Sequence, residues 1–145
     1  MTNTNSYTGY NGQARAFLRK AGARMSITYV KQVNGFPFDP NDRHMHDMYS
    51  VRIDRGGKSY RFPFYQSAYG TDMGERPDAY YVLACLEKDC YCTDAWDFAD
   101  EYGYTVRSRS DFERVTRIYN ACKKQAEKLH RLFGEELMDD LREIC

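Results

Sequence analysis

Two histidines lie close together in a polar segment that also carries aspartates. His44 and His46 flank Met45, Asp47 follows directly, and Asp42 precedes the group. Imidazole nitrogens and carboxylate oxygens are common metal ligands, so this segment could start a metal site and support a metal-dependent hydrolase. The spacing is not that of a common site, and further ligands would have to come from elsewhere in the chain. We therefore expect an ordinary polar loop without a metal.

Three cysteines form a second cluster with the chemistry of metal ligands. Cys85, Cys90 and Cys92 are close in sequence, but a structural zinc site usually pairs two short motifs, and no second motif is visible. Cys122 or Cys145 could complete such a site, although nothing in the spacing requires it. Because the number of cysteines is odd and the chain shows no sign of secretion, we expect reduced thiols.

Carboxylates are frequent between residues 87 and 101. Acid catalysis by a pair of carboxyl groups needs an apolar setting that raises the pKa of one of them. We expect none of these carboxylates to lie in such a setting. At helical spacing they form a solvated face, which could also dock onto a basic protein groove or imitate the phosphates of DNA. The candidate contact residues are Asp94, Asp97, Asp100 and Glu101.

Basic side chains are concentrated on a predicted hairpin. Arg52 and Arg61 should lie side by side on its exposed face, with Arg55 and Lys58 at the tip. This patch could contact phosphates or an acidic protein surface. Long side chains that simply extend into water explain the same pattern equally well.

Common catalytic motifs are missing from the sequence. The chain has no phosphate-binding loop, no dinucleotide-binding glycine motif and no nucleophile elbow, and it has three histidines in all. We therefore expect a protein that is not an enzyme and needs no cofactor.

The hairpin that carries the basic patch has the clearest local pattern in the chain. Gly56 and Gly57 separate two alternating segments, which predicts a two-residue turn. With a strand over 25–33, the hairpin predicts a three-stranded antiparallel sheet, and Pro63 indicates that its own strand either lies at an edge or ends there. The cross-strand pairs expected on one face are Ile53 with Tyr60, Val51 with Phe62, and Tyr49 with Phe64. Met25, Ile27, Tyr29 and Val33 are expected on one face of the first strand.

Helical patterns fill the second half of the chain. The expected helices cover 79–88, 94–102, 111–133 and 135–145. Asp78, Thr93 and Ser110 are the expected N-caps of the first three. In the longest helix, apolar residues recur every three or four positions and predict one buried stripe. The opposite, basic face carries Arg114, Arg117, Lys124, Lys128 and Arg131.

The order of these elements predicts an α+β fold, in which a small antiparallel sheet packs on a C-terminal helical half. The 145 residues fit one domain. We expect this domain to cover 25–145, with 1–24 as an N-terminal extension that holds a short helix over 13–21.

Overall composition limits the compartment and the partners. No segment approaches the roughly 18 consecutive apolar residues of a membrane span, and no secretory signal opens the chain, so we expect a cytoplasmic protein without a membrane partner. The net charge is zero but alternates in blocks along the chain. These blocks are expected to pair on folding, and the neutral total argues against direct nucleic-acid binding.

Tyrosine is unusually frequent, with 13 residues. Several tyrosines fall in predicted loops or at the ends of elements, where they favour a binding role, because tyrosine offers a large contact area at low entropic cost. These residues include Tyr65, Tyr69, Tyr91 and Tyr104.

Four segments carry a resemblance to known proteins: YRFPFYQSAYG, DAYYVLACLEKD, WDFADEYGYTVRSRS and IYNACKKQAEKLHRLFGEEL. Over roughly residues 25–140 the chain resembles a family of short uncharacterised proteins encoded by bacteriophages and prophages. The VLACL and FADEYGY segments carry most of the specificity. The resemblance places the usual start at Met25. It fails at Thr105, Val106 and Arg107, where the family more often has acidic residues.

The resemblance transfers no activity and no site residues to this chain. Small phage proteins without enzyme motifs often inhibit bacterial defence, so by analogy we expect a stoichiometric, anti-CRISPR-like inhibitor of a host defence protein complex in the bacterial cytoplasm. The acidic face or the basic hairpin would be its contact. The alternative is a nucleic-acid-binding accessory protein that uses the basic hairpin and the basic helix face. The oligomeric state stays open.

Overall fold

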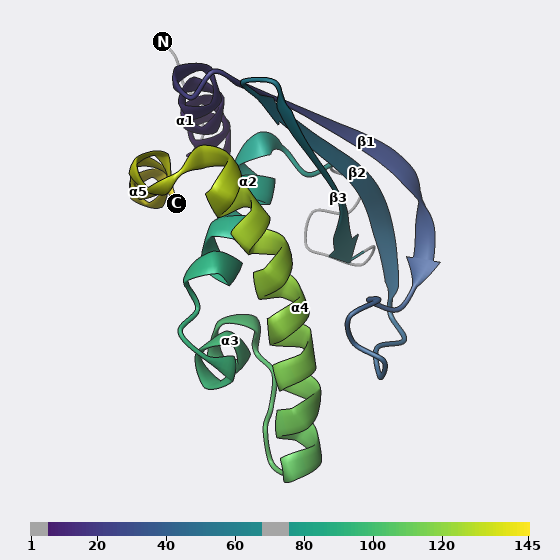
Figure 1. The fold of residues 1–145 in the computed structure, drawn as a ribbon. Coiled ribbons are helices and arrows are strands. Elements are labelled where there is room, and N and C mark those ends of the chain that lie inside the picture. The colour runs from purple at the N-terminus through teal and green to yellow at the C-terminus, as the bar shows by residue number, and fades with distance from the viewer. Residues whose placement is uncertain (1–5, 68–75) are drawn as a thin grey trace.

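A twisted sheet forms one layer of the structure, and helices form the other (Figure 1). The computed structural model describes residues 6–67 and 76–145. Its elements are α1 (Ser6–Lys20), β1 (Ala23–Asn34), β2 (Met45–Arg55), β3 (Lys58–Ser67), α2 (Ala79–Tyr91), α3 (Ala95–Tyr102), α4 (Arg109–Phe133) and α5 (Glu135–Ile144). Three antiparallel strands and a largely helical C-terminal half confirm the predicted α+β class. No helix in the described part of the chain is long and apolar enough to cross a membrane.

The hairpin of β2 and β3 has the predicted register. Ile53 pairs with Tyr60, and the two pairs that follow on the same face are also those expected from the sequence. Gly56 and Gly57 both have positive φ, at 55° and 80°, which is the backbone geometry of a tight two-residue hairpin turn. The strand order is β1-β2-β3, so Pro63 lies on an edge strand, the first of the two predicted alternatives, and β3 continues past it to Ser67.

Strand β1 contains an irregularity that the alternating pattern did not predict. Its register against β2 shifts between Tyr29 and Lys31, which leaves Val30 as the extra residue of a bulge. The prediction that Val33 shares a face with Ile27 is therefore wrong. Because side chains alternate along a strand, one inserted residue moves all following side chains to the other face.

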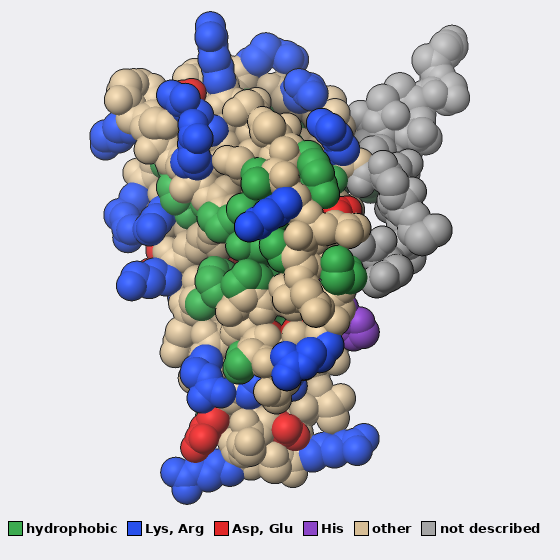
Figure 2. Space-filling view, turned by 90° about the vertical axis from the view of Figure 1, so that its right-hand side faces the viewer, with side chains coloured by type: hydrophobic (Ala, Val, Ile, Leu, Met, Phe, Trp, Pro, Cys, Tyr) green, Lys and Arg blue, Asp and Glu red, His purple; other side chains and the backbone are tan. Residues whose placement is uncertain are grey.

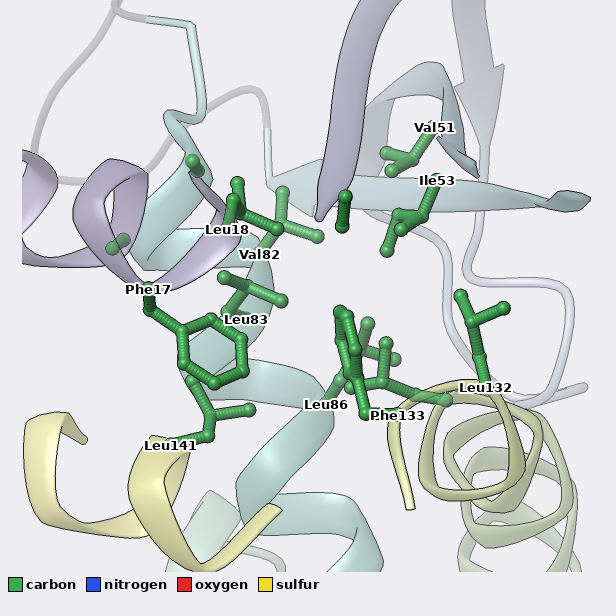
Figure 3. Packing of buried hydrophobic residues seen from close by; sticks show 14 of the residues in the cluster. Phe17, Leu18, Val51, Ile53, Val82, Leu83, Leu86, Leu132, Phe133 and Leu141 are labelled. Carbon is green, nitrogen blue, oxygen red and sulfur yellow. The ribbon is translucent and has the colours of Figure 1, made fainter. Parts of the chain in front are cut away.

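The helical layer has two core clusters, and both use α4. The first cluster lies between the sheet, α1, α2, α5 and the C-terminal half of α4, which includes Leu129 and Phe133. The second packs α3 against the N-terminal half of α4, around Ile118. Figure 3 shows side chains from α1, α2, β2, α4 and α5 pointing into the first cluster. The predicted apolar stripe of α4 therefore serves two cores in succession.

Helix α1 is longer than the sequence predicted and belongs to the main core. We expected a helix over 13–21, whereas α1 begins at Ser6. Phe17 and Leu18 are buried in the first cluster together with Val51 of the sheet. Residues before Met25 thus pack with the rest of the domain in this structure.

Local hydrogen bonds define the helix ends. Asp78 caps α2 as predicted. Two predicted caps are wrong: Asp94 rather than Thr93 caps α3, and Ser108 rather than Ser110 caps α4. The carboxylate of Asp111 accepts a hydrogen bond from the backbone N–H of residue 107 while its own N–H donates to Ser108, so a reciprocal cap forms two residues earlier than expected.

Arg55 joins the hairpin to the ends of two helices. Its Nε donates to the carbonyl of Ala21 and its Nη1 to the carbonyl of Leu132, both at 2.9 Å. Carbonyls at the C-terminal end of a helix lack partners within the helix and attract cations. The prediction that Arg55 belongs to an exposed patch at the hairpin tip is therefore wrong, because its guanidinium is used inside the structure.

We predict that Arg55→Met lowers the free energy of unfolding by about 2 kcal/mol, because it removes two charge-assisted hydrogen bonds from partly buried carbonyls. The matched control is Lys58→Met at the opposite turn position, where the exposed side chain should contribute less than about 0.5 kcal/mol. Urea unfolding followed by circular dichroism measures both. Equal losses in the two variants would contradict this role of Arg55.

Candidate functional site

The outer face of the sheet is open, because the helices cover only the other face (Figure 1). Register places Ser26, Arg52 and Arg61 in one cross-strand row on this outer face, and Arg24 and Asp54 in the neighbouring row. Between the cations lie short hydroxyl side chains that leave the guanidinium groups accessible. These are Ser26, Thr28, Ser50 and Ser59.

One acidic residue lies among these cations on the outer face of the paired strands. Arg52 Nε donates to Asp54 at 2.9 Å. Hydrogen bonds from Ser59 and Arg52 lower the pKa of Asp54, so the carboxylate partly neutralises Arg52. Among the described residues, no hydrogen bond or ion pair engages Arg24 or Arg61, and both side chains are exposed.

The basic side of α4 adjoins the edge strand β3. Tyr60 Oη donates to the carbonyl of Gln125 at 2.9 Å, and Gln125 Nε2 donates to the carbonyl of Pro63 at 3.3 Å. Lys128 Nζ lies 5.8 Å from the centre of the Tyr60 ring. The exposed cations of α4 therefore continue the positive charge of the sheet across this edge.

We call this combined region the basic surface. It comprises Arg24, Lys31, Arg52, Lys58, Arg61, Lys124, Lys128 and Arg131. Figure 2 views the sheet side of the molecule, where Lys and Arg side chains surround apolar ones and few acidic side chains are visible. The structure thus brings together the predicted basic hairpin and the predicted basic helix face, and adds two cations of β1 that sequence reasoning missed.

The prediction that Arg114 belongs to the exposed basic face of α4 is wrong. Its Nε and Nη2 donate to the two carboxylate oxygens of Asp39 at 2.8 and 2.6 Å. Asp39 is buried, with 5% of its surface exposed, and a buried carboxylate needs a partner that replaces its hydration. Arg114 therefore fastens the loop between β1 and β2 to α4 and is not free to meet a ligand.

We predict that Asp39→Asn lowers the free energy of unfolding at neutral pH by about 3 kcal/mol, because it leaves Arg114 without its bidentate partner. Hydrogen bonds, mainly from Arg114, hold the pKa of Asp39 below its usual value. A lowered folded-state pKa stabilises the fold above the unfolded-state pKa, and this contribution is lost as pH falls through the folded-state pKa.

The difference between the wild type and Asp39→Asn should therefore shrink on acidification below about pH 4. Urea unfolding at neutral and at acidic pH measures this change. Asp54→Asn is the control, because Asp54 accepts its hydrogen bonds at the exposed surface and should matter little. A gap that stays constant with pH would contradict the assigned role of Asp39.

The predicted acidic contact residues all belong to the α3 region, but they are not equally free. Asp94 accepts a hydrogen bond from the backbone N–H of Asp97, and the Asp97 carboxylate accepts from the N–H and hydroxyl of Thr93. Glu101 lies 3.7 Å from Lys88. Asp100 is exposed. Asp94 and Asp97 are therefore engaged in hydrogen bonds at the N-terminus of α3, and Asp97 is also half-buried. The predicted solvated face is thus only partly free to contact a partner.

The most exposed large apolar side chain of this region was not among the residues predicted from the sequence. Trp96, the single tryptophan of the chain, is 56% exposed and its ring lies 4.8 Å from that of Phe112. One turn later on the same side of the helix stands Asp100. The sequence signal that could have identified Trp96 is its position beside, and not on, the buried stripe of α3 that contains Ala95 and Phe98. We call Asp94, Trp96, Asp100 and Glu101 the α3 patch.

The histidine segment has a structural explanation. His46 Nδ1 lies 2.9 Å from the carbonyl of His44 and 3.5 Å from the Asp42 carboxylate. Asp42 also accepts hydrogen bonds from the backbone N–H groups of Phe36 and His44. Among residues 6–67 and 76–145, no group of three or more His, Cys, Asp or Glu side chains is arranged to hold a metal ion.

The cysteine cluster consists of free thiols in apolar surroundings. Burial raises the pKa of Cys85 to about 12 and that of Cys92 to about 11. Burial also raises the pKa of Cys90. Since a thiolate is the reactive and metal-binding form, these protonated thiols are poor nucleophiles and poor ligands at neutral pH.

The described tyrosines among those suggested as surface contacts are only partly exposed. Tyr65 is in β3, Tyr91 ends α2 and Tyr104 follows α3, and all three are half-buried. Burial raises the pKa of Tyr104 to about 12. Tyr69 lies outside the described residues.

Searches of protein-family models, curated proteins and solved structures found no match to this chain. The resemblance to bacteriophage proteins stays a prediction from the sequence segments quoted above. Functional inference therefore depends on the basic surface and the α3 patch.

Proposed function

We propose that this protein is a non-enzymatic binding protein that contacts nucleic acid through its basic surface. The supporting observation is that positive charge from the sheet and from α4, far apart in sequence, meets on one open side of a molecule whose net charge is zero. Charge segregated in this way produces a local positive potential that the overall neutrality conceals.

The composition of the surface suits contacts to the phosphate backbone. Guanidinium groups of Arg24, Arg52 and Arg61 can form paired hydrogen bonds with phosphate oxygens, and the neighbouring hydroxyls can donate further ones. Such contacts position a nucleic acid without reading its sequence. We therefore expect binding with little sequence preference and a strong dependence on salt.

We predict that the double variant Arg24→Ser/Arg61→Ser weakens binding to a short fluorescein-labelled DNA duplex in fluorescence polarisation. If each arginine neutralises one phosphate, the slope of log K against log salt should become shallower by about 2. The matched control is Arg107→Ser/Arg109→Ser, which removes the same charge beside the N-terminus of α4 and away from the basic surface. Equal effects of both variants, or binding that does not depend on salt, would contradict the proposal.

A second candidate function is inhibition of a bacterial defence protein complex through the α3 patch. The observation that favours it is Trp96, because tryptophan is enriched at the energetic centres of protein interfaces and here it is more than half exposed. The surrounding carboxylates of Asp94, Asp100 and Glu101 would complement a basic protein surface. The resemblance to bacteriophage proteins is the reason to look for a defence complex.

We predict that Trp96→Ala reduces the recovery of a defence-complex subunit from nuclease-treated bacterial lysate by at least about tenfold, the loss expected for an interface hot spot. A pull-down with tagged protein and mass spectrometry measures this recovery. The control is Tyr29→Ala, which truncates another exposed aromatic residue on β1. Recovery that survives Trp96→Ala would remove the α3 patch from consideration. Recovery that disappears with nuclease alone would favour the nucleic-acid proposal.

A further inference from the structure

A cavity of about 230 Å³ lies between the sheet and the helices α2, α3 and α4. Its walls are largely aromatic and come from separate parts of the chain: Phe36 precedes β2, Tyr65 is in β3, Phe98 is in α3 and Tyr104 follows that helix. The ring centres of Phe36 and Tyr65 lie 5.7 Å apart, and those of Phe98 and Tyr104 lie 6.0 Å apart. Aromatic side chains therefore line much of a space smaller than a typical drug-sized pocket.

Among the described residues that line this aromatic cavity, Asp89 has the one carboxylate. Asp89 of α2 lies on its wall and accepts a hydrogen bond from the hydroxyl of Tyr102, which lines the same space. No Lys or Arg is found among the described lining residues. Loss of hydration raises the pKa of Asp89 to about 6, so the carboxylate is mostly ionised at neutral pH although its surroundings disfavour the charge. The prediction that no carboxylate between residues 87 and 101 has a setting that raises its pKa is therefore wrong.

We propose that this cavity binds a small organic cation of the quaternary or methylated ammonium class. Aromatic ring faces carry a negative electrostatic potential and attract such cations, and the Asp89 carboxylate supplies the counter-charge. The assignment is independent of the basic surface and of the α3 patch.

Two other occupants fit the cavity less well. A metal ion would need several oxygen, nitrogen or sulfur ligands, and the described residues offer no such group here. A purely apolar ligand would leave the carboxylate of Asp89 facing hydrocarbon, which costs free energy that a cation would recover. An ammonium ion with methyl groups satisfies both the rings and the carboxylate.

The test compares choline with the neutral alcohol in which a carbon atom replaces the choline nitrogen. Both probes have the same shape, so isothermal titration calorimetry isolates the contribution of the charge. We expect choline to bind at least about tenfold more tightly than the alcohol near neutral pH. Equal binding of the two probes, or binding of neither, would overturn the proposal.

Asp89→Asn keeps the size of the side chain and removes its charge. We expect this variant to lose about tenfold in affinity for choline and to leave the affinity for the alcohol unchanged. If the variant does not fold, Phe36→Leu serves the same purpose, because it keeps the wall apolar but removes one aromatic ring. A variant that weakens both probes equally would show that only shape matters, and would contradict the proposal.

Choline binding should also depend on pH with a defined sign. A cation binds the ionised carboxylate, so affinity should fall about tenfold between about pH 7.5 and about pH 5 as Asp89 becomes protonated. Other titratable or charged groups among the described residues also face Asp89 or line the cavity: Lys88, Cys85, Cys92, Tyr102, Cys122, His46, Tyr65, Tyr81 and Tyr104. The pH dependence should disappear in Asp89→Asn. If it persists there, another group controls it and the role of Asp89 is wrong.

Discussion

The fold of this protein depends on helix α4, whose apolar side packs into two hydrophobic cores. The apolar stripe of α4 contacts the sheet, α1, α2 and α5 along its C-terminal half, and contacts α3 along its N-terminal half. Removal of apolar surface from water is the main driving force for such packing. Because the same stripe continues through both clusters, the direction of α4 sets where the sheet, the short helix α3 and their connecting loop can lie.

The open side of the sheet follows from the same constraint. A small antiparallel sheet needs cover on one face only, and the helices provide it. The other face can carry Arg24, Arg52 and Arg61 without loss of core, while α4 presents its own cations beside β3. Arg55 differs from its neighbours because its alternation places it on the covered side, where two helix ends supply carbonyl partners. Strand alternation thus places Arg55 in a structural role and leaves the other arginines of the sheet exposed.

The aromatic cavity lies where the sheet and the helices meet without filling the intervening space. The ion pair of Asp39 and Arg114 holds the loop before β2 against α4, and this loop contributes Phe36 to the cavity wall. The second core positions Phe98 and the residues after α3 on the opposite side. The cavity is therefore formed by the two cores together with the ion pair of Asp39 and Arg114, and no single segment contains it.

The sequence by itself determined the α+β class, the hairpin register and the approximate positions of the helices, because these depend on interactions between residues close in the chain. A Gly-Gly turn and alternating apolar residues specify the pairs from Ile53 to Phe64, and Asp78 caps α2 through a neighbouring N–H. Only the tertiary structure decided the bulge at Val30, the inward use of Arg55 and Arg114, the exposure of Trp96 and the place of Asp89 beside aromatic rings. These features depend on partners distant in sequence, and local periodicity contains no information about which distant side chain meets another once the layers pack.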